Sequence, residues 1–479
     1  MRPRTLAAHL TTFGFHKLIQ IAGALSFAFL IPRLLGPERF GQLSFVYSLG
    51  LIVQMAGDLG GLDIMGRFGP GWSTAGERGR QQTVWLVWQL FVLRLILGLL
   101  LTVGLALLLP RFVFWISPWQ AALLGLVVAL RLLSWTAYHL AFALNQTGRW
   151  LFELSWRQIL LTPLLWGLAP LGLDGILLAL LATEFLFLLP GLYWTRPYLR
   201  PRPFSWPRLK PFLQFGLRFF LANVFIIWLY QSGPVLLEFL THDTVAVGHL
   251  GLALNVFMLF TVVYTQALAS FVPTLSLLRG RDRAERLAAW LDGLTRYSAL
   301  TMALCFIGVA FLAQPITPLV FGRGYTPAAG LMLTLSLALL LQPPVWIGRY
   351  AATALGHSRA LVAGAMAGAS TMILLVTPLI LRLHSIGATW ALVVGLAAFA
   401  GVLGRLARDW LPLPWRRLGQ IYAPLVLMLP LFYAEQALLP RVLLLLAFAC
   451  VYLLLMRRLG IISLSELRQA LAGALDRGA

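Results

Sequence analysis

The sequence predicts an all-α polytopic membrane protein with about 14 transmembrane helices. Hydrophobic residues make up 60% of the 479 residues, charged residues make up only 11%, and the mean hydropathy is +0.84. A soluble domain is about half apolar and one quarter charged. The composition therefore excludes a soluble enzyme, a disordered chain and a coiled coil. The apolar runs are continuous rather than alternating, which argues against a transmembrane β-barrel.

Spanning helices are expected wherever an apolar run reaches about 20 residues. Fourteen such runs occur, and the fifth is the weakest because Glu153 and Arg157 fall in its first half. The runs cover residues 11–34, 41–63, 83–109, 119–145, 150–170, 175–194, 212–237, 245–272, 297–320, 328–350, 361–381, 386–404, 419–437 and 441–456.

Basic residues divide unevenly between the two sides that alternate loops define. The loops on the side of the N-terminus hold 26 Lys and Arg residues, and the opposite loops hold 6. Because basic loops stay in the cytoplasm, we expect a cytoplasmic-membrane protein with both termini inside. The net charge of +21 follows from the same rule, so no nucleic-acid partner is expected.

A segment rich in proline and arginine divides the predicted helices. Residues 196–211 contain five prolines and five basic residues, and repeated proline blocks helix continuation. The pair Phe-Gly opens both the first and the seventh run, which indicates two six-helix lobes with parallel topology. We therefore expect a lobe over 1–195, a cytoplasmic linker over 196–211, a second lobe over 212–410, and two further helices with a tail over 411–479. Amphipathic patterns also predict surface helices over 281–296 and after Ser463.

The sequence offers no catalytic or metal-binding constellation. The seven histidines are scattered, and no glycine-rich loop has the context of a nucleotide site. Cys305 and Cys450 lie inside apolar runs and are expected to be core residues. The loops opposite the N-terminal side are short, which argues against a membrane glycan polymerase or ligase with catalysis there.

Charged residues inside the predicted helices are the candidate site residues, because each costs about 2.5–3.5 kcal/mol at a helix centre. The bases can form a cationic cavity, and guanidinium groups suit phosphate because they donate paired hydrogen bonds. The acids are candidates for coupling to an ion gradient. The predicted substrate-binding residues are Lys17, Arg94, Arg131, Arg218 and Arg349, and the ion-coupling candidates are Asp58 and Glu184.

Structural roles for the same residues remain open at this point. The side chains of Lys17, Arg218 and Arg349 can snorkel to the membrane interface. Arg94 or Arg131 can pair with Glu184 as a buried ion pair, and Asp58 can cap the end of the second helix or pair with Arg67. The sequence alone does not choose between these roles and substrate binding.

Five short motifs give the chain a family resemblance. They occupy Leu35–Gly41, Asp58–Gly61, Leu319–Tyr325, Ala354–Arg359 and Ser385–Leu392. With the 14-helix topology, they make the chain resemble the polysaccharide transporter (O-antigen flippase) family of the multidrug/oligosaccharidyl-lipid/polysaccharide exporter superfamily.

The resemblance implies a flippase without covalent chemistry. Its substrate would be an undecaprenyl-diphosphate-linked oligosaccharide for surface polysaccharides such as lipopolysaccharide O-antigen, moved to the outer leaflet by alternating access. Lys17 and Arg218 would face a cavity built mainly by helices 1, 2, 7 and 8. No cofactor is implied beyond coupling H⁺ or Na⁺. A monomer in the lipid bilayer is expected, with polysaccharide polymerase machinery as a candidate partner.

Two other transport functions compete with this reading. A flippase for peptidoglycan lipid precursors would share the diphosphate group of the substrate. A cation-coupled multidrug exporter of the same superfamily would need acidic residues to dominate the cavity, whereas basic residues dominate the predicted spans.

Overall fold

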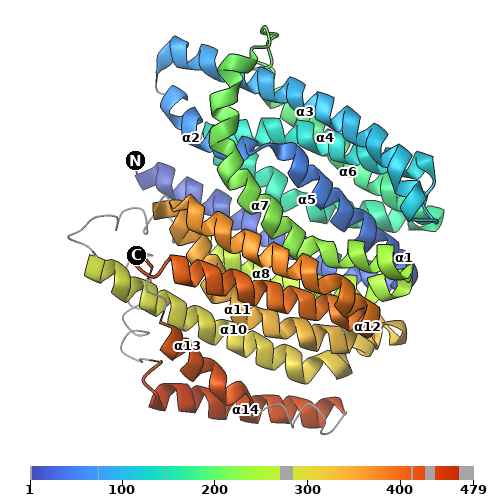
Figure 1. The fold of residues 1–479 in the computed structure, drawn as a ribbon, viewed down its shortest axis with the longest axis vertical. Coiled ribbons are helices and arrows are strands. Elements are labelled where there is room, and N and C mark those ends of the chain that lie inside the picture. The colour runs from blue at the N-terminus through green and yellow to red at the C-terminus, as the bar shows by residue number, and fades with distance from the viewer. Residues whose placement is uncertain are drawn as a thin grey trace.

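The structure is a computed structural model that describes residues 3–73, 75–144, 146–269, 284–355, 357–411, 414–426 and 437–462. Within these ranges the chain is helical and contains no β-strand (Figure 1). Ten helical stretches are long and apolar enough to cross a membrane. These findings confirm the predicted fold class of a multi-pass, all-α membrane protein.

Three of the ten stretches are long enough for two crossings. They span Gly14–Asp58, Gly148–Thr195 and Ser358–Leu406, with 45, 48 and 49 residues, whereas one crossing needs about 20 residues. Each of them contains a break in the helix, so the described part of the chain has helix enough for thirteen crossings. The predicted run over 419–437 lies largely outside the described residues, as does the predicted surface helix after Ser463.

The breaks have local causes. Helix α1 (Pro3–Asp58) reverses at Gly36, whose φ of 72° suits glycine, and the following Pro37 has no amide hydrogen to continue the helix. Helix α12 (Ser358–Leu406) reverses at His384, with φ of 51°. A 3₁₀ turn over Ala169–Leu171 separates α5 (Thr147–Leu168) from α6 (Gly172–Thr195). Helix α5 is therefore a complete helix of 22 residues despite its weak apolar run.

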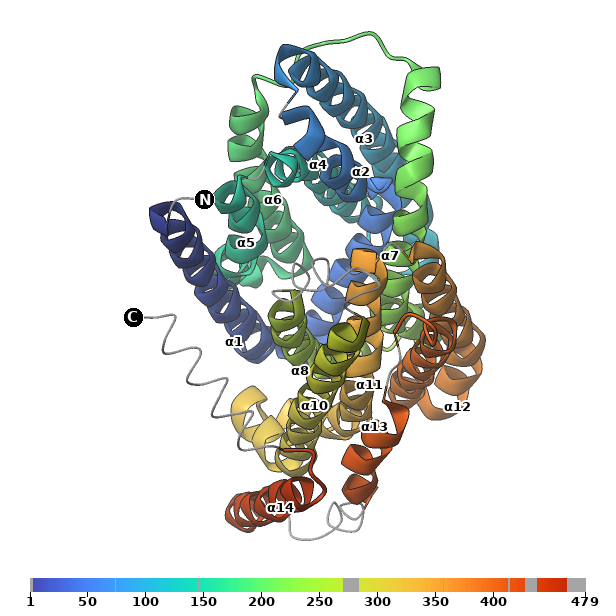
Figure 2. The ribbon, with the colours of Figure 1, turned by 90° about the vertical axis from the view of Figure 1, so that its left-hand side faces the viewer.

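The crossings form two bundles, which Figure 2 shows above and below one another. The first bundle comprises α1, the short α2 (Gly61–Ser73), α3 (Gly76–Phe112), α4 (Pro118–Ala143), α5 and α6. The second comprises α7 (Trp206–Thr241), α8 (Thr244–Ala269), α10 (Ala284–Phe321), α11 (Ala328–Leu355) and α12. Helices α13 (Trp415–Tyr422) and α14 (Leu438–Arg458) pack on α10. The residue boundaries expected for the two lobes remain a prediction.

The two ends of the bundles are named here by their landmarks. The linker face carries residues 196–205, and the turn face carries the reversal of α1 at Gly36. The expected surface helix over 281–296 is, from Ala284 on, the first part of the continuous helix α10.

The linker and the start of α7 are fixed to the first bundle. The buried amide of Gln89 on α3 donates to the carbonyl oxygen of Pro203 at 3.1 Å and accepts from the amide of Ser205 at 3.4 Å. The guanidinium of Arg208 lies 4.2 Å from the ring of Trp85. The ring of Phe212 meets that of Phe68 edge-on at 4.9 Å. Helix α7 therefore begins on the first bundle and continues into the second.

Candidate functional site

A cavity of about 290 Å³ lies between the two bundles. Helices α1, α4 and α5 line it from the first bundle, and α7 and α8 line it from the second. The hydroxyl of Ser48 on α1 donates to the side-chain oxygen of Gln231 on α7 at 3.0 Å, so the bundles touch across it. Its neutral polar lining residues include Gln20, Ser44, Tyr47, Ser48, Gln158, Gln231 and Asn255.

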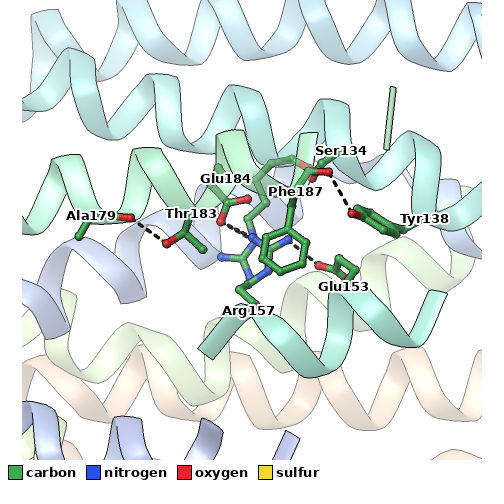
Figure 3. A network of polar contacts seen from close by, with 9 residues as sticks. Ser134, Tyr138, Glu153, Arg157, Ala179, Thr183, Glu184 and Phe187 are labelled. Atoms are coloured by element: carbon green, nitrogen blue, oxygen red, sulfur yellow. Dashed lines mark hydrogen bonds and ion pairs between the residues drawn. The ribbon is translucent and has the colours of Figure 1, made fainter. Parts of the chain in front are cut away.

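The charged side chains of the cavity come from the first bundle. Arg131 on α4 and the pair Glu153 and Arg157 on α5 line the cavity, and Glu184 on α6 lies behind them. Arg157 donates to Glu153 at 2.7 Å and also to Glu184. The Nε atom of Arg131 lies 3.7 Å from the carboxylate of Glu184. Figure 3 shows Arg157 between the two carboxylates.

The local sequence explains how this cluster is held. Glu153 and Arg157 are four residues apart, which places them on one face of α5. The guanidinium of Arg157 lies over the ring of Phe187 at 4.9 Å, and the hydroxyl of Tyr138 on α4 donates to the carbonyl oxygen of Phe187 at 2.9 Å. Rings and hydrogen bonds thus tie α4, α5 and α6 together around the cluster (Figure 3).

The cluster is buried but not saturated with hydrogen bonds. The side chains of Glu153 and Arg157 are 8% exposed and that of Glu184 is 3% exposed, whereas Arg131 is 15% exposed. The Nε atoms of Arg131 and Arg157 and one oxygen of Glu184 have no hydrogen-bond partner. Buried polar atoms normally have partners, so these three atoms are exceptions within the cluster.

A second buried cluster contains Arg94 and Asp58, away from the cavity lining. Arg94 on α3 donates to the hydroxyl of Thr136 at 2.9 Å, to the backbone oxygen of Asp58 at 3.2 Å, and to the Asp58 carboxylate. The Nδ1 atom of His139 on α4 lies 3.2 Å from Arg94. This cluster holds the end of α1 against α3 and α4.

The other predicted site residues lie in separate places. Lys17 donates to Gln20 at 3.0 Å and to Gln266 of α8, one turn of α1 from the cavity lining. Arg349 on α11 donates to Asn223 of α7 at 3.0 Å. The side chain of Arg218 lies outside the described residues. The structure thus brings Arg131 together with Glu184, and Arg94 together with Asp58, but does not gather the candidate bases in one place.

The family model described as polysaccharide biosynthesis protein matches residues 30–330, which is more than half of the chain. The chain belongs to this family. The match covers the charged cavity cluster and the Arg94–Asp58 cluster, and it confirms the predicted family resemblance. No curated protein sequence matches the chain significantly.

Solved structures show the same fold. The lipid II flippase MurJ in its inward closed conformation is similar with a TM-score of 0.72 at 14% identity, over 95% of this chain and 99% of that one. An inward-facing MATE multidrug transporter of the MOP superfamily gives 0.60 at 17% identity, over 82% of this chain and 94% of that one. An outward-facing MATE multidrug transporter of the same superfamily gives 0.52 at 16% identity, over 82% of this chain and 92% of that one. The chain therefore shares the fold of these solved structures.

Glu153 and Arg157 are not among the predicted site residues, because their charges marked the fifth run only as the weakest span. Their signal was the acid–base pair at i, i+4 spacing inside an apolar helix. Among the described residues, no three His, Cys, Asp or Glu side chains gather as a metal site would require.

Proposed function

We propose that the protein is a flippase that carries polyprenyl-diphosphate-linked oligosaccharide across the cytoplasmic membrane by alternating access, with its linker face in the cytoplasm. The observation that carries this proposal is the cavity between the bundles, with Arg131 and Arg157 on one wall and neutral polar side chains around it. Guanidinium groups suit the diphosphate. Amides and hydroxyls can both donate to and accept from sugar hydroxyls.

The size of the cavity supports a carrier that changes shape. Pockets for small molecules measure about 300–1,000 Å³, and this cavity of about 290 Å³ lies at the lower limit. A lipid-linked oligosaccharide needs more room. The bundles must therefore separate to admit it, as alternating access requires.

The carboxylates give the site a way to couple to protons. A diphosphate that takes the guanidinium groups of Arg131 and Arg157 would displace Glu184 from them. Because an unpaired buried charge is costly, we propose that Glu184 then takes up a proton. Asp58, which is paired with Arg94, remains a coupling candidate from the sequence. Lys17, Arg218 and Arg349 remain candidate diphosphate contacts near the linker face.

The charge of the site does not favour export of small cations. Two arginines and two glutamates form the cluster, so it has no negative excess to hold a cation. A peptidoglycan lipid precursor carries the same diphosphate group and remains the alternative substrate.

Transport by the purified protein in proteoliposomes tests the proposal. A fluorescent polyprenyl-diphosphate oligosaccharide, a peptidoglycan lipid precursor and a drug-like cation are compared in parallel. We expect the oligosaccharide lipid to change leaflets. Arg131→Gln should slow this about ten- to hundredfold, since hydrogen bonds to charged groups contribute about 1.5–3 kcal/mol.

The matched control is Arg382→Gln, which changes an exposed arginine away from the cavity lining. It should flip lipid at the original rate. Movement of the cation alone, or equal rates for the two variants, would contradict the proposal. Movement of the peptidoglycan precursor alone would assign that precursor as the substrate in place of the oligosaccharide lipid.

A separate prediction concerns Glu184→Gln. This variant keeps the size of the side chain but cannot exchange a proton, so flipping should lose its response to an imposed pH gradient. The rate is measured with and without the gradient. Glu77→Gln changes a glutamate whose side chain is 70% exposed on α3 and should keep the response. A full response in Glu184→Gln would rule out this residue as the coupling group.

A further inference from the structure

Two of the five sequence motifs meet at the turn face and take no part in the charged cluster. The first, Leu35–Gly41, contains the reversal of α1, and the second, Leu319–Tyr325, ends α10 in the second bundle. Tyr325 is only 1% exposed. Its hydroxyl donates to the carbonyl oxygen of Pro32 on α1 at 2.9 Å, and its ring meets that of Phe40 edge-on at 6.2 Å. Motifs about 280 residues apart in sequence therefore form one contact between bundles.

The Pro32 carbonyl lies beside the break in α1. Pro32 is in the last turn before Gly36, where the regular hydrogen bonds of the helix end. The carbonyls of this turn can therefore accept from outside their own helix. A buried oxygen without a donor is destabilising. The Tyr325 hydroxyl supplies the donor from the other bundle.

Backbone contacts close the same face beside this hydrogen bond. Gly248 of α8 lies so close to the carbonyl oxygen of Pro37 that a Cβ atom would overlap it, and Gly41 lies equally close to the carbonyl oxygen of Thr244. These contacts, with Tyr325 and Pro32, are called the turn-face seal below.

A further hydrogen bond joins the bundles nearby. The indole nitrogen of Trp115, in the turn between α3 and α4, donates to the carboxylate of Glu238 on α7 at 2.6 Å. Glu238 is fully buried. The first bundle therefore meets α7, α8 and the end of α10 at this face.

We propose that the turn-face seal is the gate on the side where cargo leaves, and that Tyr325 is its latch. When the bundles separate at this face, the Tyr325 hydroxyl must release the Pro32 carbonyl and α1 must withdraw from α8. The hydrogen bond thus stabilises only the state that is closed at the turn face. The direction of cargo release rests on the proposed function, but the closure rests on the contacts alone.

Solvent access to the cavity tests this gate without any substrate. Cys305 and Cys450 are replaced by serine, and Asn255→Cys places one thiol on the cavity wall. A membrane-impermeant maleimide is then added from the turn-face side of oriented proteoliposomes. We expect Tyr325→Phe to raise the labelling rate about two- to tenfold, because it removes one hydrogen bond but keeps the ring.

Tyr452→Phe is the matched control. The Tyr452 hydroxyl also donates to a backbone carbonyl at 2.9 Å, that of Ile421, but this bond joins α14 to α13 and does not cross between the bundles. Its labelling rate should stay at that of the parent. Equal rates for Tyr325→Phe and the control would overturn the latch.

A second variant acts on the backbone contact. Gly248→Ala inserts a Cβ atom where the Pro37 carbonyl lies, so it should raise labelling from the turn face more than Tyr325→Phe does. Gly308→Ala adds a Cβ atom to a helix position with nothing within 4 Å and should leave labelling unchanged. Unchanged labelling in a folded Gly248→Ala protein would contradict closure at this face. Because no substrate is used, a negative result here is distinct from failure of the flippase proposal.

Discussion

Arg157→Leu is expected to lower the melting temperature of the protein sharply and to abolish flipping. The substitution leaves the carboxylates of Glu153 and Glu184 buried without the guanidinium that both now contact. Removing one partner of a buried ion pair costs about 3–5 kcal/mol, against a total stability of about 5–15 kcal/mol for a typical domain. Thermal unfolding in detergent and the leaflet assay measure the two effects.

A compensating substitution separates the two roles of Arg157. Adding Glu153→Gln to Arg157→Leu leaves one arginine and one glutamate in the cluster, Arg131 and Glu184, which lie 3.7 Å apart, so most of the melting temperature should return. Flipping should not return, because the cavity wall then lacks the guanidinium proposed to bind the diphosphate. Recovery of flipping in this double variant would show that Arg157 stabilises the bundle without binding substrate.

Arg94→Met is expected to destabilise the protein to a similar extent. Arg94 is fully buried, and its substitution leaves the carboxylate of Asp58 without the guanidinium that it now contacts. The expected loss is again about 3–5 kcal/mol. The double variant Asp58→Asn with Arg94→Met should recover both stability and flipping, because this cluster does not line the cavity. In the compensated Arg157 variant, by contrast, stability should return and flipping should not.

The parent protein, Asp58→Asn, Arg94→Met and the double variant form a double-mutant cycle. The coupling energy between Arg94 and Asp58 is read from their unfolding free energies. The exposed pair Arg80 and Glu77, at 3.8 Å, is the control and should couple by less than about 1 kcal/mol. Loss of flipping in a stable Asp58→Asn, Arg94→Met protein would instead assign Asp58 a role in transport.

The fold could be predicted because a bilayer imposes a single length on every apolar run. The sequence did not predict that the helices α1 and α12 each join two apolar runs across a one-residue break. Gly36 and His384 reverse the chain without a polar loop, so two runs appear as one interrupted helix. The packing of the start of α7 on the first bundle could not be predicted either, because it depends on contacts of Phe212 and of the side-chain amide of Gln89.

The site was harder to predict, because contacts between helices depend on how each helix is rotated. The sequence offered Glu184 as a partner for Arg131, and the structure places them 3.7 Å apart. It did not offer Asp58 as a partner for Arg94, because that pair joins the end of α1 to the middle of α3. Arg157 was passed over because a charge in an apolar run was taken as a weak span rather than as half of a pair.

The charge balance of the cavity cluster has a consequence for the energetics of a transport cycle. Two arginines and two glutamates leave the cluster without net charge. Reorientation of the empty carrier would then meet little resistance from the membrane voltage. An anionic diphosphate would add its own charge, and a potential negative inside would push it outward by about 2.3 kcal/mol per charge per 100 mV. In such a carrier the voltage would act on the cargo and not on the protein, and each proton bound with the cargo would reduce that electrical drive.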